Sequence, residues 1–271
     1  MSKPVIRSNY VKWERFLVDL QEKGRYTFTF NELRSYFDLS DESLLQGLFR
    51  YKQKKRIVQI RKGFYAILTP EYSRQGMLPY HLFIDDLMKS LNKPYYVALL
   101  SASALYGAAH QQPMEYFVIS KTPAPRSISS KKLKITFLSK NSWESDDIIQ
   151  QTTNAGYINV SSPELTALDL ISYSEKIGLN RATTILYELA QSISVGRITR
   201  SLKKYPNTSV IQRLGYIMDK VLNEKKIAEV LMKNLNTRNI TPVLLSTRKP
   251  QQGLIDETWK VILNMKIESD L

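Results

Sequence analysis

The sequence predicts an α+β protein in which an N-terminal winged helix-turn-helix is followed by a larger mixed α/β domain. Two observations lead to this prediction. The first seventy residues run in the order helix, strand, helix, turn, helix and β-hairpin. They also carry 14 Lys and Arg against 7 Asp and Glu, so half of the net charge of +14 lies in about a quarter of the chain. We therefore predict a DNA-binding domain over residues 1–70, a connector over 71–92 and an α+β domain over 93–271.

The first helix is indicated by apolar residues with the spacing i, i+3, i+4 and i+7, and we expect it over residues 10–23. The residues of this apolar face are Trp13, Phe16, Leu17 and Leu20. Aromatic residues then alternate with threonines from Tyr26 to Phe30, which predicts a short strand. Asn31 is a suitable N-cap for a second, short helix.

A third helix is predicted from Asp41 to Lys54, because Ser40 is a favourable N-cap and acidic residues suit the first turn. We expect its buried side to consist of Leu44, Leu45, Leu48 and Phe49. The opposite side is polar, and its candidate DNA-reading residues are Ser43, Gln46, Gly47, Arg50 and Lys54. Arg and Gln read guanine and adenine edges, and an exposed glycine permits the close approach of a base. An ordinary solvent-exposed face is the alternative interpretation.

Two β-rich segments, residues 57–60 and 64–68, follow the third helix. They are joined by Arg61-Lys62-Gly63, a tight turn in which glycine supplies a positive φ. We expect this hairpin to form the wing, with the candidate backbone-contacting residues Lys55, Arg56, Arg61 and Lys62. From charge alone, a solvated basic surface is an equally good interpretation.

Beyond residue 70 the apolar pattern predicts a mixed α/β domain whose topology the sequence does not define. A short helix over residues 80–91 is followed by a buried apolar helix from Tyr95 to Ala109, too short to span a membrane. Residues 121–130 are predicted as a loop, and strands are predicted at residues 115–120, 132–138, 157–160, 241–246 and 259–263. Further helices are predicted after the N-cap Ser162 and near residues 180–194, 208–222 and 224–235.

The sequence contains no constellation expected for catalysis. It has no cysteine, and the HExxH, Walker, GxGxxG and GxSxG motifs are absent. His81 and His110 stand alone and are interpreted as structural, and the pairs Asp85-Asp86 and Asp146-Asp147 as solvated acidic residues. We therefore predict no catalytic residue, no metal ion and no cofactor.

The estimated pI of 9.7 indicates an acidic partner, and double-stranded DNA is the first candidate. Membrane surfaces and acidic proteins are the alternatives. The start of the sequence lacks the apolar stretch of a signal peptide, so we expect a cytoplasmic protein without a membrane anchor.

Several motifs follow the basic N-terminal region in a defined order. They are Tyr96 to Ala102, Leu105 to Ala108, Ser161 to Leu170 and Arg213 to Tyr216. In this order the chain, from about residue 10 to residue 235, resembles the AbiEi antitoxin family. The motif residues singled out as candidate site residues of the antitoxin domain are Asp169, Arg213, Gly215 and Tyr216. Asp169 lies in an apolar segment, where burial requires a partner, and Leu165 departs from the family, which often carries Arg there.

The resemblance implies the antitoxin half of a type IV toxin–antitoxin system, which acts in abortive infection as a defence against phage. Members of this family repress their own operon by binding inverted repeats at the promoter. They oppose a nucleotidyltransferase toxin without requiring a stable complex with it. The resemblance further implies that the N-terminal domain binds DNA and that the C-terminal domain is needed to neutralise the toxin.

Two other functions remain as alternatives. A winged-helix transcription factor whose second domain senses a small molecule would release DNA when that ligand binds. An RNA-directed enzyme would use the basic face to capture its substrate, but the lack of a catalytic constellation argues against this alternative. A nucleotidyltransferase reading frame immediately downstream would favour the antitoxin.

Overall fold

The computed structural model describes residues 3–108 and 115–268, and it confirms the predicted α+β class. The chain divides into two compact units. The first comprises Met1–Tyr95, Pro125–Phe137 and Gln150–Asn159, and the second comprises Tyr96–Ala124, Leu138–Ile149 and Val160–Leu271. Each unit therefore draws on separate stretches of the chain, so the two units do not follow one another along the sequence.

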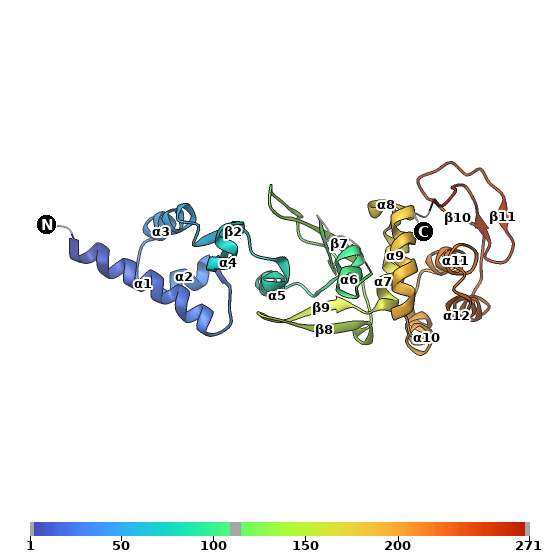
Figure 1. The fold of residues 1–271 in the computed structure, drawn as a ribbon, viewed down its shortest axis with the longest axis horizontal. Coiled ribbons are helices and arrows are strands. Elements are labelled where there is room, and N and C mark those ends of the chain that lie inside the picture. The colour runs from blue at the N-terminus through green and yellow to red at the C-terminus, as the bar shows by residue number, and fades with distance from the viewer. Residues whose placement is uncertain (1–2, 109–114, 269–271) are drawn as a thin grey trace. The chain divides into compact units, whose positions relative to one another are not determined.

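The N-terminal part of the first unit has its helices and strands in the predicted order (Figure 1). These elements are α1 (Lys3–Glu22), β1 (Thr27–Thr29), α2 (Phe30–Tyr36), α3 (Asp41–Gln53), β2 (Ile57–Arg61) and β3 (Phe64–Ile67). The strands form an antiparallel sheet in the order β1-β3-β2. Because β1 pairs with β3, the hairpin is joined to the strand that precedes α2.

Local hydrogen bonds explain where α2 and α3 begin. Thr29 caps α2: its hydroxyl accepts from the Glu32 backbone N–H at 3.1 Å, and the Glu32 carboxylate accepts from the Thr29 N–H at 2.8 Å. The expected cap Asn31 therefore lies inside the helix. Ser40 caps α3 as predicted, with its hydroxyl 3.3 Å from the Ser43 backbone nitrogen. The first helix begins at Lys3, well before the predicted residue 10.

The predicted buried side of α3 is partly wrong. Leu44 and Leu48 are buried, but Leu45 is 53% exposed and Phe49 is 58% exposed. Gly47 and Tyr51 occupy the buried side instead. The cause lies in α1, because the indole of Trp13 packs so closely on Gly47 that a Cβ there would lie 2.3 Å from Trp13 Cζ2.

We expect Gly47→Ala to destabilise the protein. In an exposed helix, alanine is favoured over glycine by about 1 kcal/mol, but forcing a methyl group into a packed core costs about 1–3 kcal/mol. Gly196→Ala is the matched control, since the nearest atom to a Cβ there is Ser194 Oγ at 4.0 Å. Urea unfolding followed by circular dichroism should give a lower midpoint for Gly47→Ala and an equal or higher one for Gly196→Ala. Equal midpoints for Gly47→Ala and the parent would contradict this packing.

Residues 71–92, predicted as a connector, contain regular structure and buried side chains. The elements of this region are α4 (Pro70–Ser73), the 3₁₀ turn η1 (Tyr80–Leu82) and α5 (Ile84–Ser90). The sequence analysis interprets Asp85 and Asp86 as solvated residues, but in the structure both carboxylates have partners within the protein. Asp86 accepts a 2.5 Å hydrogen bond from Thr27 Oγ1, and Asp85 accepts one from the Tyr95 hydroxyl and pairs with Lys89.

A six-stranded sheet has the order β6-β7-β5-β4-β9-β8. Its strands are β4 (Tyr95–Val97), β5 (Tyr116–Lys121), β6 (Ile128–Ser129), β7 (Lys134–Lys140), β8 (Ile148–Thr153) and β9 (Gly156–Ser161). Strand β4 corrects the prediction of one apolar helix from Tyr95, since the helix α6 covers Leu99–Leu105 only. Strand β4 runs parallel to β9 and is fully buried, and such strands lack the alternation that marks a half-exposed strand.

The helices of the second unit surround α7 (Pro163–Ser172), which is buried from Pro163 to Ile171. Helix α7 packs against α6, α9 (Leu179–Leu189), α10 (Val195–Lys204) and α11 (Thr208–Tyr216). The remaining helical elements are α8 (Ser174–Ile177), η2 (Ser145–Asp147), η3 (Ala190–Ser192), the π-helical η4 (Ile217–Val221) and α12 (Lys225–Leu235). Helix α10 lies just past the predicted helix at 180–194 and was not anticipated.

The C-terminal segment forms a small sheet beside α11, with the order β10-β12-β11 (Figure 1). Its strands are β10 (Val243–Leu244), β11 (Ile255–Asp256) and β12 (Val261–Ile262). The predicted strands at residues 241–246 and 259–263 correspond to β10 and β12. Across the described residues, no helix has the length and apolar character needed to cross a membrane.

Candidate functional site

The outward face of α3 presents several of the predicted DNA-reading residues. Ser43, Gln46 and Arg50 are exposed, and Gln46 and Arg50 are neighbours on the helix surface because they are four residues apart. The Arg50 guanidinium is 3.4 Å from the Gln46 carbonyl oxygen. Gly47 does not belong to this face, because it is buried against Trp13 and cannot meet a base.

The basic residues around α3 and the hairpin differ in how freely they can reach a polyanion. Lys55 and Lys62 are exposed. Arg56 forms a 2.8 Å ion pair with Glu14 of α1, and the Lys54 ammonium lies 4.9 Å from the centre of the Tyr10 ring. These contacts still leave positive charge at the surface, since the Arg56 side chain is 44% exposed.

The hairpin turn is held in place by the backbone. Gly63 has φ +75°, which favours glycine, and its carbonyl oxygen accepts a 2.8 Å hydrogen bond from the Phe30 N–H. Arg61 is half-buried, and its Nη1 atom has no hydrogen-bond partner among the described residues. Lys62 therefore stands as the exposed cation at the tip of the hairpin, which is the position expected for a phosphate contact.

Asp169 is fully buried and paired, as the sequence required of it. Its Oδ1 atom lies 2.6 Å from Lys140 Nζ, and its Oδ2 atom accepts a 2.8 Å hydrogen bond from the Tyr96 hydroxyl. The Lys140 ammonium also lies 5.4 Å from the centre of the Tyr205 ring. Burial, followed by the nearby Asp169 charge, raises the pKa of Tyr96 well above its ordinary value. The geometry makes Asp169 a buried bridge between α7, β7 and β4.

The motif on α11 fixes the C-terminal segment to the rest of the second unit. Arg213 Nε donates a 2.7 Å hydrogen bond to the Leu244 carbonyl oxygen in β10. Gly215 faces the Trp259 ring so closely that a Cβ would lie 1.9 Å from Trp259 Cζ3. Tyr216 is half-buried and packs against the same core. The contacts of these three residues join α11 to the C-terminal segment and to the core, which is a structural role.

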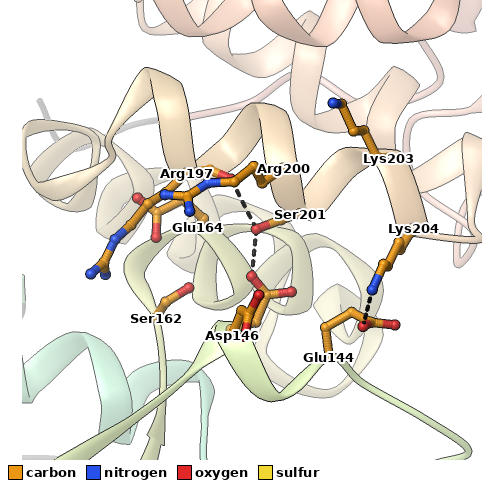
Figure 2. A pocket seen from close by; sticks show the side chains of 10 residues that line it. Glu144, Asp146, Ser162, Glu164, Arg197, Arg200, Ser201, Lys203 and Lys204 are labelled. Carbon is orange, nitrogen blue, oxygen red and sulfur yellow. Dashed lines mark hydrogen bonds and ion pairs between the residues drawn. The ribbon is translucent and has the colours of Figure 1, made fainter.

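A polar pocket of about 290 Å³ in the second unit was not anticipated from the sequence. Figure 2 shows Arg197, Arg200 and Lys203 of α10 on one side, and Glu144 and Asp146 on the other. Lys204 and Glu144, which also line the pocket, form a 2.7 Å ion pair (Figure 2). The feature of the sequence that could have indicated this pocket is the segment Val195–Lys204, which carries several basic residues and no acidic one.

Two carboxylates that line this pocket, Glu164 and Asp147, accept hydrogen bonds from neighbouring residues. Glu164 is 1% exposed: Oε1 accepts from the Ser194 N–H at 2.8 Å, but Oε2 has no hydrogen-bond partner among the described residues. Asp147 accepts a 2.5 Å hydrogen bond from Ser201 Oγ. Burial and the charge of Glu164 raise the pKa of Asp147, against the lowering effect of Ser201. Asp147 is therefore not the solvated residue that the sequence suggested.

Among the described residues, no three His, Asp or Glu side chains converge to hold a metal ion. Burial lowers the pKa of His81, which favours its neutral form. His110 lies outside the described residues.

Comparisons with known proteins agree with the resemblance seen in the sequence. Residues 96–220 match the family model of the AbiEi antitoxin C-terminal domain. The chain is also similar to the crystal structure of the RV2827C protein from Mycobacterium tuberculosis, with a TM-score of 0.63 and 18% identity over 93% of this chain and 91% of that one. At this identity the likeness is one of fold. The search of curated proteins returned no match.

Proposed function

We propose, from the match of residues 96–220 to the AbiEi antitoxin C-terminal domain family, that the protein is the DNA-binding antitoxin of a type IV toxin–antitoxin operon. In this proposal it represses its own promoter by binding inverted repeats, and it counteracts a nucleotidyltransferase toxin during abortive infection. The antitoxin role itself follows from the family domain. The protein acts as a regulator and not as an enzyme, and no stable complex with the toxin is needed.

The observation that supports DNA binding is the outward face of α3. It presents Gln46 and Arg50, and the segment that follows α3 carries the exposed cations Lys55 and Lys62. A winged helix-turn-helix places a helix of this kind in the major groove and its hairpin on the phosphate backbone. In the proposal, α3 is the recognition helix and the β2–β3 hairpin is the wing.

We expect Arg50→Ala and Gln46→Ala to weaken specific binding to the promoter of this gene while leaving the fold unchanged, because both side chains are exposed. Loss of one bidentate base contact costs about 1–3 kcal/mol, which is roughly a 5- to 150-fold loss of affinity. Binding of each variant to promoter and scrambled duplexes is the measurement. If discrimination between the two duplexes is unchanged, α3 does not read sequence. Both variants, expressed from an unrelated promoter, should still rescue cells from the neighbouring toxin.

We expect Lys62→Ala to weaken binding to every duplex by a similar factor, because a phosphate contact carries no sequence information. Loss of one phosphate contact reduces the slope of log K against log[salt] by about 0.9. The slope should be measured for the parent, for Lys62→Ala and for Lys249→Ala, a cation far along the chain in the C-terminal segment. A Lys62→Ala slope equal to that of the parent would mean that the hairpin does not touch DNA.

The polar pocket supports a second candidate, a ligand-sensing transcription factor. Its supporting observation is the buried Glu164 Oε2 atom without a hydrogen-bond partner among the described residues, at the wall of a cavity large enough for a small polar molecule. Such a regulator would release promoter DNA on addition of a small-molecule extract, and Glu164→Gln would abolish the release. An antitoxin would remain bound under the same conditions.

A further inference from the structure

Two large apolar side chains lie exposed on the outward face of α3. Leu45 is 53% exposed and Phe49 is 58% exposed, and they are neighbours because they lie four residues apart. Gln46 follows Leu45 and Arg50 follows Phe49, so the apolar pair and the polar pair run side by side along the helix. The outward face of α3 is therefore half apolar.

The core of the first unit does not need these two side chains. Its buried cluster contains Trp13, Leu44, Leu48 and Tyr51 from α1 and α3, and neither Leu45 nor Phe49 is part of it. Fully burying a leucine or phenylalanine side chain contributes about 1.5–3 kcal/mol. Because Leu45 and Phe49 stay largely exposed, folding does not gain this full free energy from either side chain. Single exposed apolar residues are common, but an adjacent exposed pair that is followed along the helix by an exposed arginine, Arg50, suggests a binding surface.

The exposed cations near the pair in the sequence favour a polyanion as its partner. Arg50, Lys55 and Lys62 are exposed. The acidic residues of α3, Asp41 and Glu42, lie in its first turn, and no further acidic residue follows until Glu71. A duplex DNA major groove combines flanking phosphates with one apolar group on its floor, the 5-methyl group of thymine. Phenylalanine and other apolar side chains contact this methyl group, while Arg and Gln read purine edges.

We propose that Leu45 and Phe49 contact thymine 5-methyl groups in the major groove, beside purines read by Gln46 and Arg50. This inference rests on the proposed function, because it requires α3 to enter the groove. It adds a chemical prediction about the binding site: thymines lie next to the purines, and their methyl groups, not only hydrogen bonds, contribute to recognition.

The test replaces thymine by deoxyuridine in promoter DNA, which removes the methyl group and keeps the base pair. We expect the full-length parent to lose about fourfold in affinity per contacted methyl group, the equivalent of one buried CH₂. Phe49→Ala should bind thymine DNA more weakly than the parent, and should no longer distinguish thymine from deoxyuridine at the contacted step. Leu254→Ala is the matched control, because Leu254 is 82% exposed in the C-terminal segment and should leave both affinities unchanged.

Four outcomes separate this inference from the proposed function. Methyl sensitivity in the parent that Phe49→Ala removes supports the inference. Specific promoter binding with equal affinity for thymine and deoxyuridine DNA overturns it and leaves the proposed function in place. Failure of the parent to bind any promoter duplex overturns both. Sedimentation showing that the parent self-associates and that Phe49→Ala does not would also overturn it, because a second copy would then cover the apolar pair. The parent measurement depends on no variant, so a misfolded variant does not decide the result.

Discussion

Replacing Lys140 with methionine is expected to lower the free energy of unfolding by about 3–5 kcal/mol, the range for removing one partner of a buried ion pair. The substitution keeps most of the apolar volume of the side chain but leaves the Asp169 carboxylate without its cation. Asp169 is fully buried, and among the described residues its carboxylate keeps the hydrogen bond from the Tyr96 hydroxyl. Urea unfolding at neutral pH, with two probes to test for a single transition, is the measurement.

Lys204→Met is the matched control for this prediction. It also removes a lysine from an ion pair, but the side chains of Lys204 and Glu144 are 66% and 45% exposed. Exposed ion pairs contribute little to stability, because water solvates both charges. We therefore expect a much smaller change for Lys204→Met than for Lys140→Met. Similar changes in the two variants would show that the Lys140–Asp169 bridge does not hold α7 in the core.

Periodicity predicts the helix α3 and its N-cap, but not the exact rotation of the helix against its neighbours. The sequence pattern includes Leu45 and Phe49 in the apolar side, because their side chains are apolar. The structure turns the helix so that Gly47 meets Trp13, a contact between α1 and α3 that no local pattern contains. The same rotation removes Gly47 from the predicted DNA-reading set and adds Leu45 and Phe49 to the outward face.

Other elements escaped prediction because their signals depend on tertiary contacts. Tyr95 to Val97 reads as part of an apolar helix, yet it forms β4, and its place between β5 and β9 in the sheet identifies it as a strand. The polar pocket brings residues from two distant stretches of the chain around the start of α7, so spacing along the sequence gives no sign of it. Asp169 is the contrary case: an acidic residue inside an apolar helix already requires a partner, although not Lys140 in particular.

The family match ends at residue 220, but the hydrophobic core that contains the matched segment continues past it. Residues beyond that point, including Leu231, Leu245 and Trp259, are buried in the same hydrophobic cluster as α7. Trp259 is 1% exposed, and its Nε1 atom donates a 3.0 Å hydrogen bond to Asp219. We conclude that the C-terminal sheet is part of this domain's structure and that a protein ending at residue 220 would lack a complete core.

Trp259→Ala is therefore expected to lower the free energy of unfolding by about 3–5 kcal/mol, as large-to-small substitutions of buried tryptophan do.

The contact of Trp259 with Gly215 allows a sharper test through a double-mutant cycle. In the parent, Gly215→Ala should be destabilising, because its Cβ would lie 1.9 Å from Trp259 Cζ3. In the Trp259→Ala background the cavity accommodates the methyl group, and alanine then favours α11 by up to about 1 kcal/mol over glycine. The effect of Gly215→Ala should thus change sign between the two backgrounds. Additive effects of the two substitutions would refute the packing of α11 against Trp259.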